Sequence, residues 1–389
     1  DSAGIFLSSG KRIRAVGKVA NLAEKVPDAT HATTGIAHTR WATHGVPSEA
    51  NAHPHCDCSE RIFIVHNGII ENHTELRMLL SQKGHVFSSE TDSEVVAHMI
   101  EEALKNERDL EAAIRSTLAQ VRGTYGLAIM DTQSPEKIVV ARMGSPIVIG
   151  IGDHEHLVAS DPSALLRHTK DVIYLDDGEM ATLTPDAYRV YRLDSTPLDK
   201  TPDHIEWDIE QVQKGGHPHF MLKEIMEIPD VLTNSARGRI IAHEGMVKLG
   251  GLESVADRLR DIQRIIIVGC GSAYYAGLVG EYMLEEHAGI PVSVELGSEF
   301  RYRSSVFEEN TALLVISQSG ETADTLASLR EAKRRGILTL GIVNTVGSTI
   351  ARETDAGIYN HAGPEIGVAS TKAFISQLEV LALLTVFLG

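Results

Sequence analysis

The sequence predicts a two-domain protein, with an α+β first half and a parallel α/β second half. Three observations support this prediction. The chain has 389 residues, enough for about two to three domains. Residues 1 to about 205 carry closely spaced strand patterns, whereas strands and helices alternate from His217 onward. Such alternation is typical of right-handed crossovers and a parallel sheet.

Composition limits the class of protein. The chain has 43% hydrophobic and 23% charged residues, as soluble globular proteins do. Its formal net charge of -17 argues against a nucleic-acid partner, which clustered Lys and Arg would bind. Three cysteines are too few for a disulfide framework, so we expect a cytoplasmic location. The most apolar run, Val380–Leu388, falls short of the roughly 20 residues that cross a bilayer, so we expect a buried helix there and no membrane partner.

Short apolar runs between turn residues predict the strands of the first half. They span residues 62–65, 126–130, 137–141, 146–151, 156–159, 172–175 and 179–183. Thr91–Glu94 has the pattern of a capping box that starts one helix, and a second helix is expected over residues 110–121. Two sheets covered by helices would suit this half.

A polar stretch that contains Pro and Gly, from about Leu198 to Gly216, marks the expected domain boundary. We therefore expect a first domain over residues 1–208, a linker over 209–218 and a second domain over 219–389. The strands of the second domain are expected at 264–268, 292–296, 312–316, 339–343 and 356–359. Ligands of such parallel sheets bind beyond the carboxyl ends of the strands.

Three strand-to-helix turns of the second half carry polar residues, at 269–272, 317–322 and 367–372. In the first turn, Tyr274 stands where a dinucleotide fingerprint needs its third glycine, so NAD is not expected. The middle turn places four side-chain donors at the start of one helix: Ser317, Gln318, Ser319 and Thr322. These donors and the free backbone N–H groups predict a phosphate site, and the alternative is that they are simple N-caps.

The stretch from His38 to Asp92 holds most of the polar chemistry of the first half. Arg40 can bind a carboxylate and Asp92 can accept from an ammonium, so together they suit a small zwitterion. The alternatives are a structural ion pair between the two, or Asp92 in the first turn of a capped helix. Trp41 alone would more often be a core residue. No metal site is expected, because the spacing of the four candidate ligands matches no zinc pattern closely; they are His53, His55, Cys56 and Cys58.

Longer motifs resemble the glutamine:fructose-6-phosphate aminotransferase (isomerising) family over essentially the whole chain. The motifs are Thr39–Gly45, Asn51–His55, His66–Asn72, Ser317–Thr325 and Glu365–Lys372. The resemblance implies an N-terminal-nucleophile glutaminase, an αββα sandwich, followed by a doubly wound parallel-sheet sugar-isomerase (SIS) domain, with no cofactor and no metal. The implied reaction converts L-glutamine and D-fructose 6-phosphate to L-glutamate and D-glucosamine 6-phosphate. A homodimer through the isomerase domain is implied as well.

The resemblance also implies roles for single residues. Arg40 would bind the carboxylate of glutamine and Asp92 its ammonium, while Asn67 and Gly68 would form the oxyanion hole. The implied glutamine-binding residues also include Trp41, Thr43 and His44, and Trp41 would gate the ammonia route as well. The implied sugar-phosphate residues are Ser272, Ser317, Gln318, Ser319, Thr322, Val368 and Ser370.

Two parts of the family pattern are not found in this sequence. One is the opening Cys-Gly-Ile-Val-Gly segment, whose thiol attacks the glutamine amide, and the other is a second SIS subdomain. We therefore expect an internal piece of a longer protein that binds its ligands better than it reacts. Two alternatives are an amidotransferase acting on phosphoribosyl pyrophosphate and a non-enzymatic sugar-phosphate regulator. The double-serine turn argues against the first, and the acidic charge argues against the second.

Overall fold

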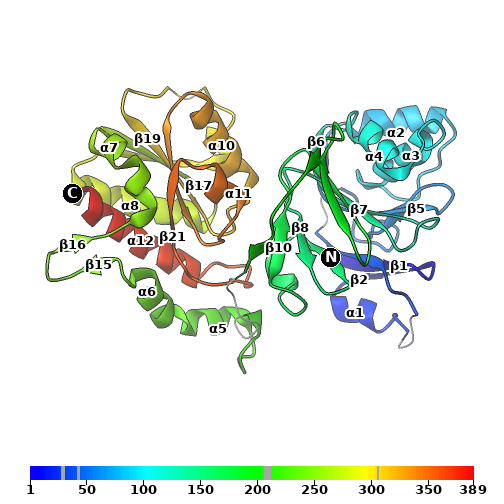
Figure 1. Cartoon of the computed structure of the whole chain (residues 1–389), viewed down its shortest axis with the longest axis horizontal. Helices are drawn as coiled ribbons and strands as arrows, with labels where there is room; N and C mark the ends of the chain where they lie inside the picture. The colour runs from blue at the N-terminus through cyan, green and yellow to red at the C-terminus, as the bar shows by residue number, and fades with distance from the viewer. Residues whose placement is uncertain (28–30, 42–43, 206–211, 305) are drawn as a thin grey trace. The chain divides into compact units, whose positions relative to one another are not determined.

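The computed structural model describes residues 1–27, 31–41, 44–205, 212–304 and 306–389. The chain divides into two compact units, Asp1–Ile205 and Glu206–Gly389 (Figure 1). Residues 206–211 lie outside the described part, so the expected domain borders at 208 and 218 stay predictions. No described helix is both long enough and apolar enough to cross a lipid bilayer.

A seven-stranded antiparallel sheet forms the centre of the first unit, in the order β13-β12-β11-β7-β6-β5-β4. In chain order these strands are β4 (His55–Cys56), β5 (Ile62–Ile70), β6 (Gly123–Asp131), β7 (Ile138–Met143), β11 (Glu179–Leu183), β12 (Tyr188–Arg192) and β13 (Pro197–Leu198). The strands expected between residues 62 and 183 are all present, although β5 continues five residues past Val65 to Ile70. This extension carries Asn67 and Gly68 into the sheet.

Helices α2 (His73–Gln82), α3 (Glu94–Ala103) and α4 (Leu110–Leu118) cover one face of this sheet (Figure 1). The predicted capping box at the start of α3 is wrong. The carboxylate of Glu94 accepts from the backbone N–H groups of Ser88 and Ser89, at 2.7 and 2.8 Å, and not from that of Thr91. The upstream turn supplies two closer donors, so the buried Glu94 fixes that turn to the helix.

Two smaller sheets cover the other face, with the orders β2-β1-β3 and β14-β10-β8-β9. Their strands are β1 (Ser2–Leu7), β2 (Lys11–Val16), β3 (Gly35–Arg40), β8 (Val148–Ile151), β9 (His156–Ala159), β10 (Asp171–Tyr174) and β14 (Asp203–His204). Phe6 stacks on Phe63 in the core between the layers, with ring centroids 3.6 Å apart. Leu22 of α1 (Val19–Ala23) packs on the outside of β1 and β2. The predicted αββα class is therefore confirmed, although β1, β2 and β3 were not predicted.

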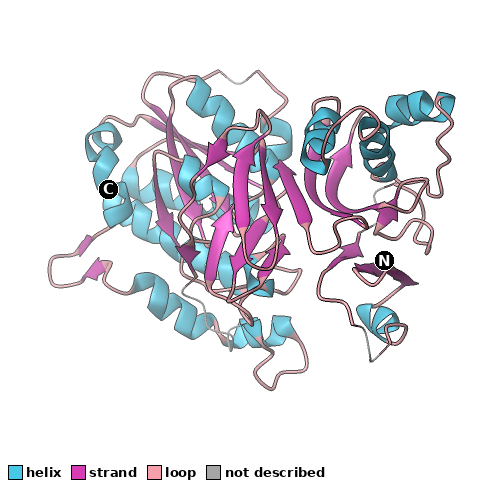
Figure 2. Cartoon of the chain, turned by 45° about the vertical axis from the view of Figure 1, so that its right-hand side comes forward, coloured by secondary structure: helices cyan, strands magenta, loops and turns pink. Residues whose placement is uncertain are grey.

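The second unit is built on a five-stranded parallel sheet in the order β18-β17-β19-β20-β21. Its strands are β17 (Arg264–Gly269), β18 (Val292–Leu296), β19 (Thr311–Ser317), β20 (Leu338–Val343) and β21 (Ala356–Tyr359). Ile265 and Ile267 face a core with α8 (Ser272–Ala288) and α12 (Lys372–Leu388). Ile266 and Val268 face the opposite core, with α9 (Gly297–Phe300), α10 (Ala323–Arg334) and α11 (Thr349–Glu353). Helices thus lie on both faces, in cyan against magenta strands in Figure 2, and the doubly wound prediction is confirmed.

The remaining elements of this unit precede the sheet. They are α5 (Phe220–Met226), α6 (Ile228–Ala236), the short pair β15 (Ile240–Ile241) and β16 (Met246–Val247), and α7 (Ala256–Arg260). The apolar run at Val380–Leu388 forms the last turns of α12, and Val380, Leu381 and Leu384 are buried there, as expected.

Candidate functional site

Arg40 ends β3 with a buried guanidinium, since the residue is only 5% exposed. Its Nη2 donates to the carbonyl oxygens of His44 and Gly45. Its Nη1 is buried and has no hydrogen-bond partner in the part of the chain that the structure describes. Burial lowers the pKa of Arg40, and the Asp92 carboxylate opposes this shift. The guanidinium therefore has one buried N–H donor group, Nη1, that could bind an acceptor of a ligand.

Asp92 lies just before α3 and is buried as well. One carboxylate oxygen accepts from the Ile70 N–H at 2.8 Å, and the other accepts from the Ser93 hydroxyl at 3.3 Å. His44 Nδ1 lies 3.9 Å from the second oxygen. Among the described residues, Arg40 and Asp92 make no direct ion pair, so the alternative of a closed structural pair is not supported.

Asn67 and Gly68 lie side by side on β5. His38 Nε2 donates to the Asn67 side-chain oxygen at 2.7 Å, which leaves the Asn67 amide nitrogen to donate elsewhere. Gly68 has a φ of +131°, and an added Cβ would lie 2.2 Å from the Thr124 carbonyl oxygen. Only glycine fits at this position, because a side chain would meet backbone rather than a movable group.

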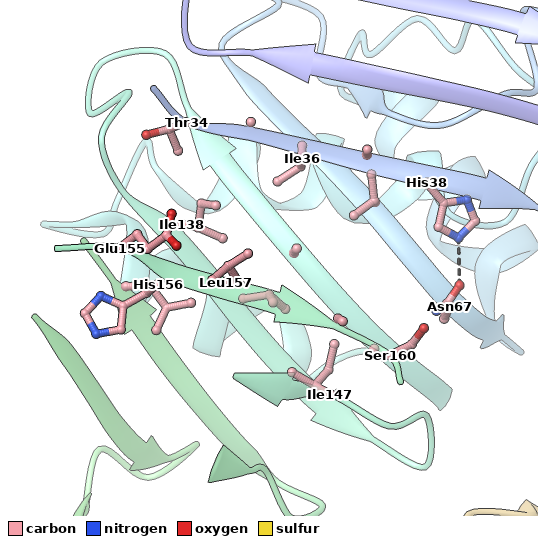
Figure 3. Close-up of a pocket in the computed structure, with 18 of the residues that line it drawn as sticks. Thr34, Ile36, His38, Asn67, Ile138, Ile147, Glu155, His156, Leu157 and Ser160 are labelled. Atoms are coloured by element: carbon pink, nitrogen blue, oxygen red, sulfur yellow. Dashed lines mark hydrogen bonds between the residues drawn. The ribbon is translucent and has the colours of Figure 1, made fainter. Parts of the chain in front are cut away.

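A cavity of about 680 Å³ opens beside this group. Figure 3 shows it between β3, which carries Ile36 and His38, and β9, which carries Leu157, with Asn67 at one end. Both β3 and β9 are terminal strands of their sheets. The cavity therefore runs between two strand edges and ends at the Asn67 side chain.

The other residues of the glutamine motif are less enclosed. Trp41 is 81% exposed, so the alternative that it belongs to the core is wrong. The His44 ring packs edge-on against His73 with centroids 5.0 Å apart, and its Nδ1 is buried without a hydrogen-bond partner among the described residues. Thr43 lies outside the described residues.

Sequence reasoning gave no role to His38 or His66, which position the site. His66 Nδ1 bonds to the Ser93 hydroxyl at 2.8 Å and so joins β5 to the start of α3. Burial lowers the pKa of both His38 and His66, which favours their neutral forms. Strand alternation could have found His38, because residues i and i+2 of a strand share a face and Arg40 is two positions away.

The predicted phosphate residues of the second unit follow β19. The Ser317 hydroxyl accepts from the Gly320 N–H at 2.9 Å and lies 3.1 Å from the Thr322 hydroxyl, while the Ser319 hydroxyl accepts from the Glu321 N–H at 3.2 Å. Thr322 is the N-cap residue of α10 but its side chain makes no capping bond, so the alternative of a simple N-cap is not supported for this residue. The turn therefore presents hydroxyls next to the free end of a twelve-residue helix.

Ser272 begins α8, which follows the neighbouring strand β17. Cys270 in that turn has its Sγ 3.7 Å from the hydroxyl of Thr325 in the first turn of α10. The two turns are therefore adjacent at the carboxyl edge of β17 and β19. Chain order reverses between these two strands, which is where open α/β sheets bind ligands.

The carboxylate of Glu321, the acidic residue of this turn, is bonded to the neighbouring helix. It accepts from the Thr349 N–H at 2.8 Å and from the Thr349 hydroxyl, so it fastens the next helix, α11. Gly320 has a φ of +68°, and a Cβ there would lie 2.0 Å from the Ser348 hydroxyl. Ser348 is a close neighbour of the turn that sequence reasoning missed.

Val368 and Ser370 lie in the loop between β21 and α12. The Ser370 hydroxyl donates to Glu365 at 2.8 Å, and Val368 is 95% exposed. Glu365 also accepts from the N–H groups of Thr371 and Ala373. Neither Val368 nor Ser370 bonds to the middle turn in the described part of the chain, so their role near the sugar stays a prediction.

Comparison with known proteins places two domains on this chain. Residues 38–167 match the glutamine amidotransferase domain, and residues 258–387 match the SIS domain. The chain is 50% identical to the glutamine–fructose-6-phosphate aminotransferase (isomerizing) of Chlorobaculum tepidum, covering 100% of this chain and 65% of that protein. It is 49% identical to the protein of the same name from Thermotoga maritima, over 90% of this chain and 57% of that protein.

A solved structure is similar to part of the chain. The C-terminal domain of glucosamine-fructose-6-phosphate aminotransferase from Francisella tularensis is 41% identical, covering 45% of this chain and 49% of that one, with a TM-score of 0.42. The chain spans about two thirds or less of the length of the curated relatives that it matches. The family resemblance indicated by the motifs is confirmed by the curated relatives.

Proposed function

We propose that this chain, a glutamine amidotransferase domain followed by a SIS domain, is part of an aminotransferase that makes D-glucosamine 6-phosphate and L-glutamate from D-fructose 6-phosphate and L-glutamine. The observation that carries the proposal is that a zwitterion site and a phosphate-type turn occur in one chain. The names of its relatives agree with this pairing. The alternative interpretation, a non-enzymatic sugar-phosphate regulator, would not explain the first site.

Glutamine would bind at the first site through its two charged ends. The unpartnered Nη1 of Arg40 suits the carboxylate, and Asp92 retains acceptor capacity for the ammonium. Because the Asn67 side-chain oxygen accepts from His38, its amide nitrogen is available to donate to the oxyanion that forms from the carbonyl oxygen of the glutamine amide. Arg40 and Asp92 thus orient the substrate, and Asn67 stabilises the transition state.

The reaction needs a thiol that attacks the amide carbon, releases ammonia and is freed by water. Cys56 accepts a hydrogen bond from Arg12, and Cys58 and Cys270 lie in other clusters, so none of the three serves Asn67. We propose that the thiol belongs to an extended segment that pairs with the edges of β3 and β9 inside the cavity. Such a segment would reach Asn67 at the end of the cavity.

The sugar phosphate would bind to neutral donors in the second unit. The hydroxyls of Ser317, Ser319 and Thr322 and the first N–H groups of α10 are the donors that would hold the anion. Such a site needs no lysine, because the helix end and the hydroxyls attract the anion. It can therefore exist in a chain with a formal net charge of -17.

A homodimer and a cytoplasmic location are further parts of the proposal. Tyr275, Val279 and Tyr282 on α8 are exposed at spacings that place them on one helix face. This apolar stripe would be covered in a dimer formed through the SIS domain. Sedimentation of the chain, with Tyr275→Ser and Tyr282→Ser as a disrupting pair, tests the assembly.

Ligand-induced stabilisation tests the phosphate assignment. Fructose 6-phosphate at millimolar concentration should raise the Tm of the chain, whereas fructose should not. Ser319→Ala with Thr322→Ala should weaken the affinity about 10-fold or more, because a hydrogen bond to a charged group contributes about 1.5–3 kcal/mol. Ser328→Ala, whose hydroxyl bonds within α10, is the matched control. An equal shift with fructose, or an unchanged shift in the double variant, would overturn the assignment.

A further inference from the structure

A second polar cluster lies in the first unit, in residues that the glutaminase chemistry does not use. Cys58 comes from the turn between β4 and β5, His85 from the loop after α2, and His98 and Glu101 from α3. One ligand atom from each of the four lies within 4.8 Å of all the others. The sequence prediction had grouped Cys58 with His53, His55 and Cys56, but Cys56 instead bonds to Arg12.

The distances in this cluster are those of a small coordination shell. His85 Nδ1 and His98 Nδ1 are 3.3 Å apart, and the Cys58 Sγ lies 3.8 and 3.4 Å from them. A Glu101 carboxylate oxygen is 3.0 Å from His85 Nδ1 and 3.6 Å from His98 Nδ1. Ligand atoms about 2.0–2.3 Å from a tetrahedral zinc ion are themselves about 3.3–3.7 Å apart. The four atoms therefore need little movement to share one ion.

The outer nitrogens of both histidines face carboxylates. His85 Nε2 is 3.2 Å from Glu102, and His98 Nε2 is 3.7 Å from Glu94. The hydrogen bond to Glu102 favours the His85 tautomer with hydrogen on Nε2, which leaves its Nδ1 with a lone pair directed inward. His98 Nε2 is buried without a hydrogen-bond partner among the described residues, so Glu94 orients it only by its charge. Carboxylates in this position are the usual second partners of histidines that bind metal. Lys83 and Lys105 in turn hold the Glu102 carboxylate.

Backbone hydrogen bonds also fix the position of Cys58. The Val86 N–H donates to this sulfur at 3.4 Å, and the Cys58 N–H donates to Glu101 at 3.2 Å. The cluster thus brings two imidazole lone pairs, a carboxylate and a sulfur together. A shared cation would satisfy all four at once, because each of these atoms can donate a lone pair to it.

We propose that Cys58, His85, His98 and Glu101 bind one Zn²⁺ ion. Binding displaces the thiol proton of Cys58 to solvent and forms the zinc–sulfur bond, while both Nδ1 atoms and Glu101 donate lone pairs. Four protein ligands complete a tetrahedron, so the site is structural and keeps no open position for a reacting water. The ion ties the β4–β5 turn to α3, the helix that follows Asp92. Cys58 is exposed, which gives the ion a route in.

Metal analysis and cobalt spectroscopy of the whole chain test this proposal. The chain should bind about one equivalent of Zn²⁺, and Co²⁺ in its place should show ligand-field bands of a tetrahedral site and a thiolate charge-transfer band. Cys58→Ser should lose the charge-transfer band and weaken binding about 100-fold, because even the loss of an outer partner typically weakens metal binding 10- to 100-fold. Cys270→Ser, in the other unit, should change neither.

Glu101→Gln provides a second variant, since Glu101 is only partly buried and the substitution keeps its shape. It should keep the cobalt–thiolate band but weaken the affinity, and circular dichroism should show that both variants are folded. Zinc binding of equal strength in wild type and Cys58→Ser would overturn the proposal. Failure of the wild-type chain to bind Zn²⁺ above the level of Cys58→Ser would do the same, whatever the outcome for fructose 6-phosphate.

Discussion

The two candidate sites would recognise charge in opposite ways. The site of the first unit uses buried ionic side chains, Arg40 and Asp92, each held by backbone groups. The turn of the second unit uses hydroxyls and a helix end, with its one acidic side chain, Glu321, turned to Thr349. A buried charge left without its opposite is costly, whereas a neutral donor can be lost singly at a modest cost. We therefore expect the first site to be the more sensitive to substitution and to pH.

Buried histidines extend this difference to the whole of each unit. His53, His55 and His66 are buried in the first unit, and the His53 ring lies between those of His38 and His55. None of the described histidines of the second unit is buried. Burial lowers the pKa of His53, His55 and His66, which favours their neutral forms.

The largest expected difference between the two units is in how much unfolding free energy each loses at acidic pH. Burial holds the pKa of His53 well below 6.5 and lowers that of His55 to about 3, although Glu94 opposes the shift of His55. Below pH 6.5 the unfolded chain binds more protons at these sites than the folded chain does. The free energy of unfolding should then fall by about 1.4 kcal/mol per pH unit for each such histidine, whereas above pH 6.5 this contribution is constant.

Hydrogen exchange of each unit at pH 7 and pH 5 measures this effect. Protection should fall more in β5 and α3 than in β17 and β19. His55→Gln should flatten the pH dependence of the first unit, even if it also lowers the stability at pH 7. Equal losses in the two units would remove the contrast.

Alanine substitutions at the two site glycines, Gly68 and Gly320, should lower the free energy of unfolding by different amounts. Gly68→Ala would place its Cβ against a backbone oxygen at a φ of +131°, so we expect a loss of about 2–4 kcal/mol of unfolding free energy. Gly320→Ala would place its Cβ 2.0 Å from the Ser348 hydroxyl and 2.5 Å from the Ser348 Cβ, so it meets side-chain atoms rather than a strand backbone and needs a small shift of the start of α11; we expect about 1–2 kcal/mol. Gly84→Ala, with a φ of +92° and no atom within 4 Å, isolates the backbone strain. Urea titrations give all three values, and the order Gly320 above Gly68 would contradict the argument.

Arg40→Lys tests the first site through ligand binding rather than through stability. The substitution keeps the charge but removes the planar pair of donors. Affinity for L-glutamate should fall about 10- to 100-fold, as expected for about 1.5–3 kcal/mol from a hydrogen bond to a charged group. Calorimetry of wild type, Arg40→Lys and the control Arg108→Lys, whose side chain is exposed, would measure this. Equal affinities in all three chains would show that Arg40 is not the carboxylate ligand.

The strands of the parallel sheet could be predicted almost residue by residue, because most of their residues are apolar and each run is bounded by turn or helix patterns. The expected strands at 292–296 and 356–359 agree with β18 and β21 at both ends. Strand β2, Lys11–Val16, could not be found this way, since three of its six residues are Lys or Arg and only one is buried. Its place depends on pairing with β1, which no local pattern encodes.

The sequence motifs predicted single site residues such as Arg40, Asn67 and Asp92, but not the contacts between residues far apart in the chain. The hydrogen bond of His38 to Asn67, for example, joins residues 29 positions apart. The zinc cluster shows the same limit more strongly, because Cys58 and His98 lie 40 positions apart and share no spacing pattern. Sequence spacing gives ligands within one helix, such as His98 and Glu101, but not those that tertiary packing adds.

The open edges of β3 and β9 also affect how the first unit unfolds. Each belongs to a separate small sheet, so no backbone hydrogen bond between described strands joins these two sheets directly. The two sheets can then open as independent cooperative units, each held mainly by the packing of its inner face. A strand bonded to both edges would merge them into one layer and make their unfolding a single event. Binding of a strand between the edges of β3 and β9 would thus be measurable as more cooperative unfolding, even where it adds little to the total stability.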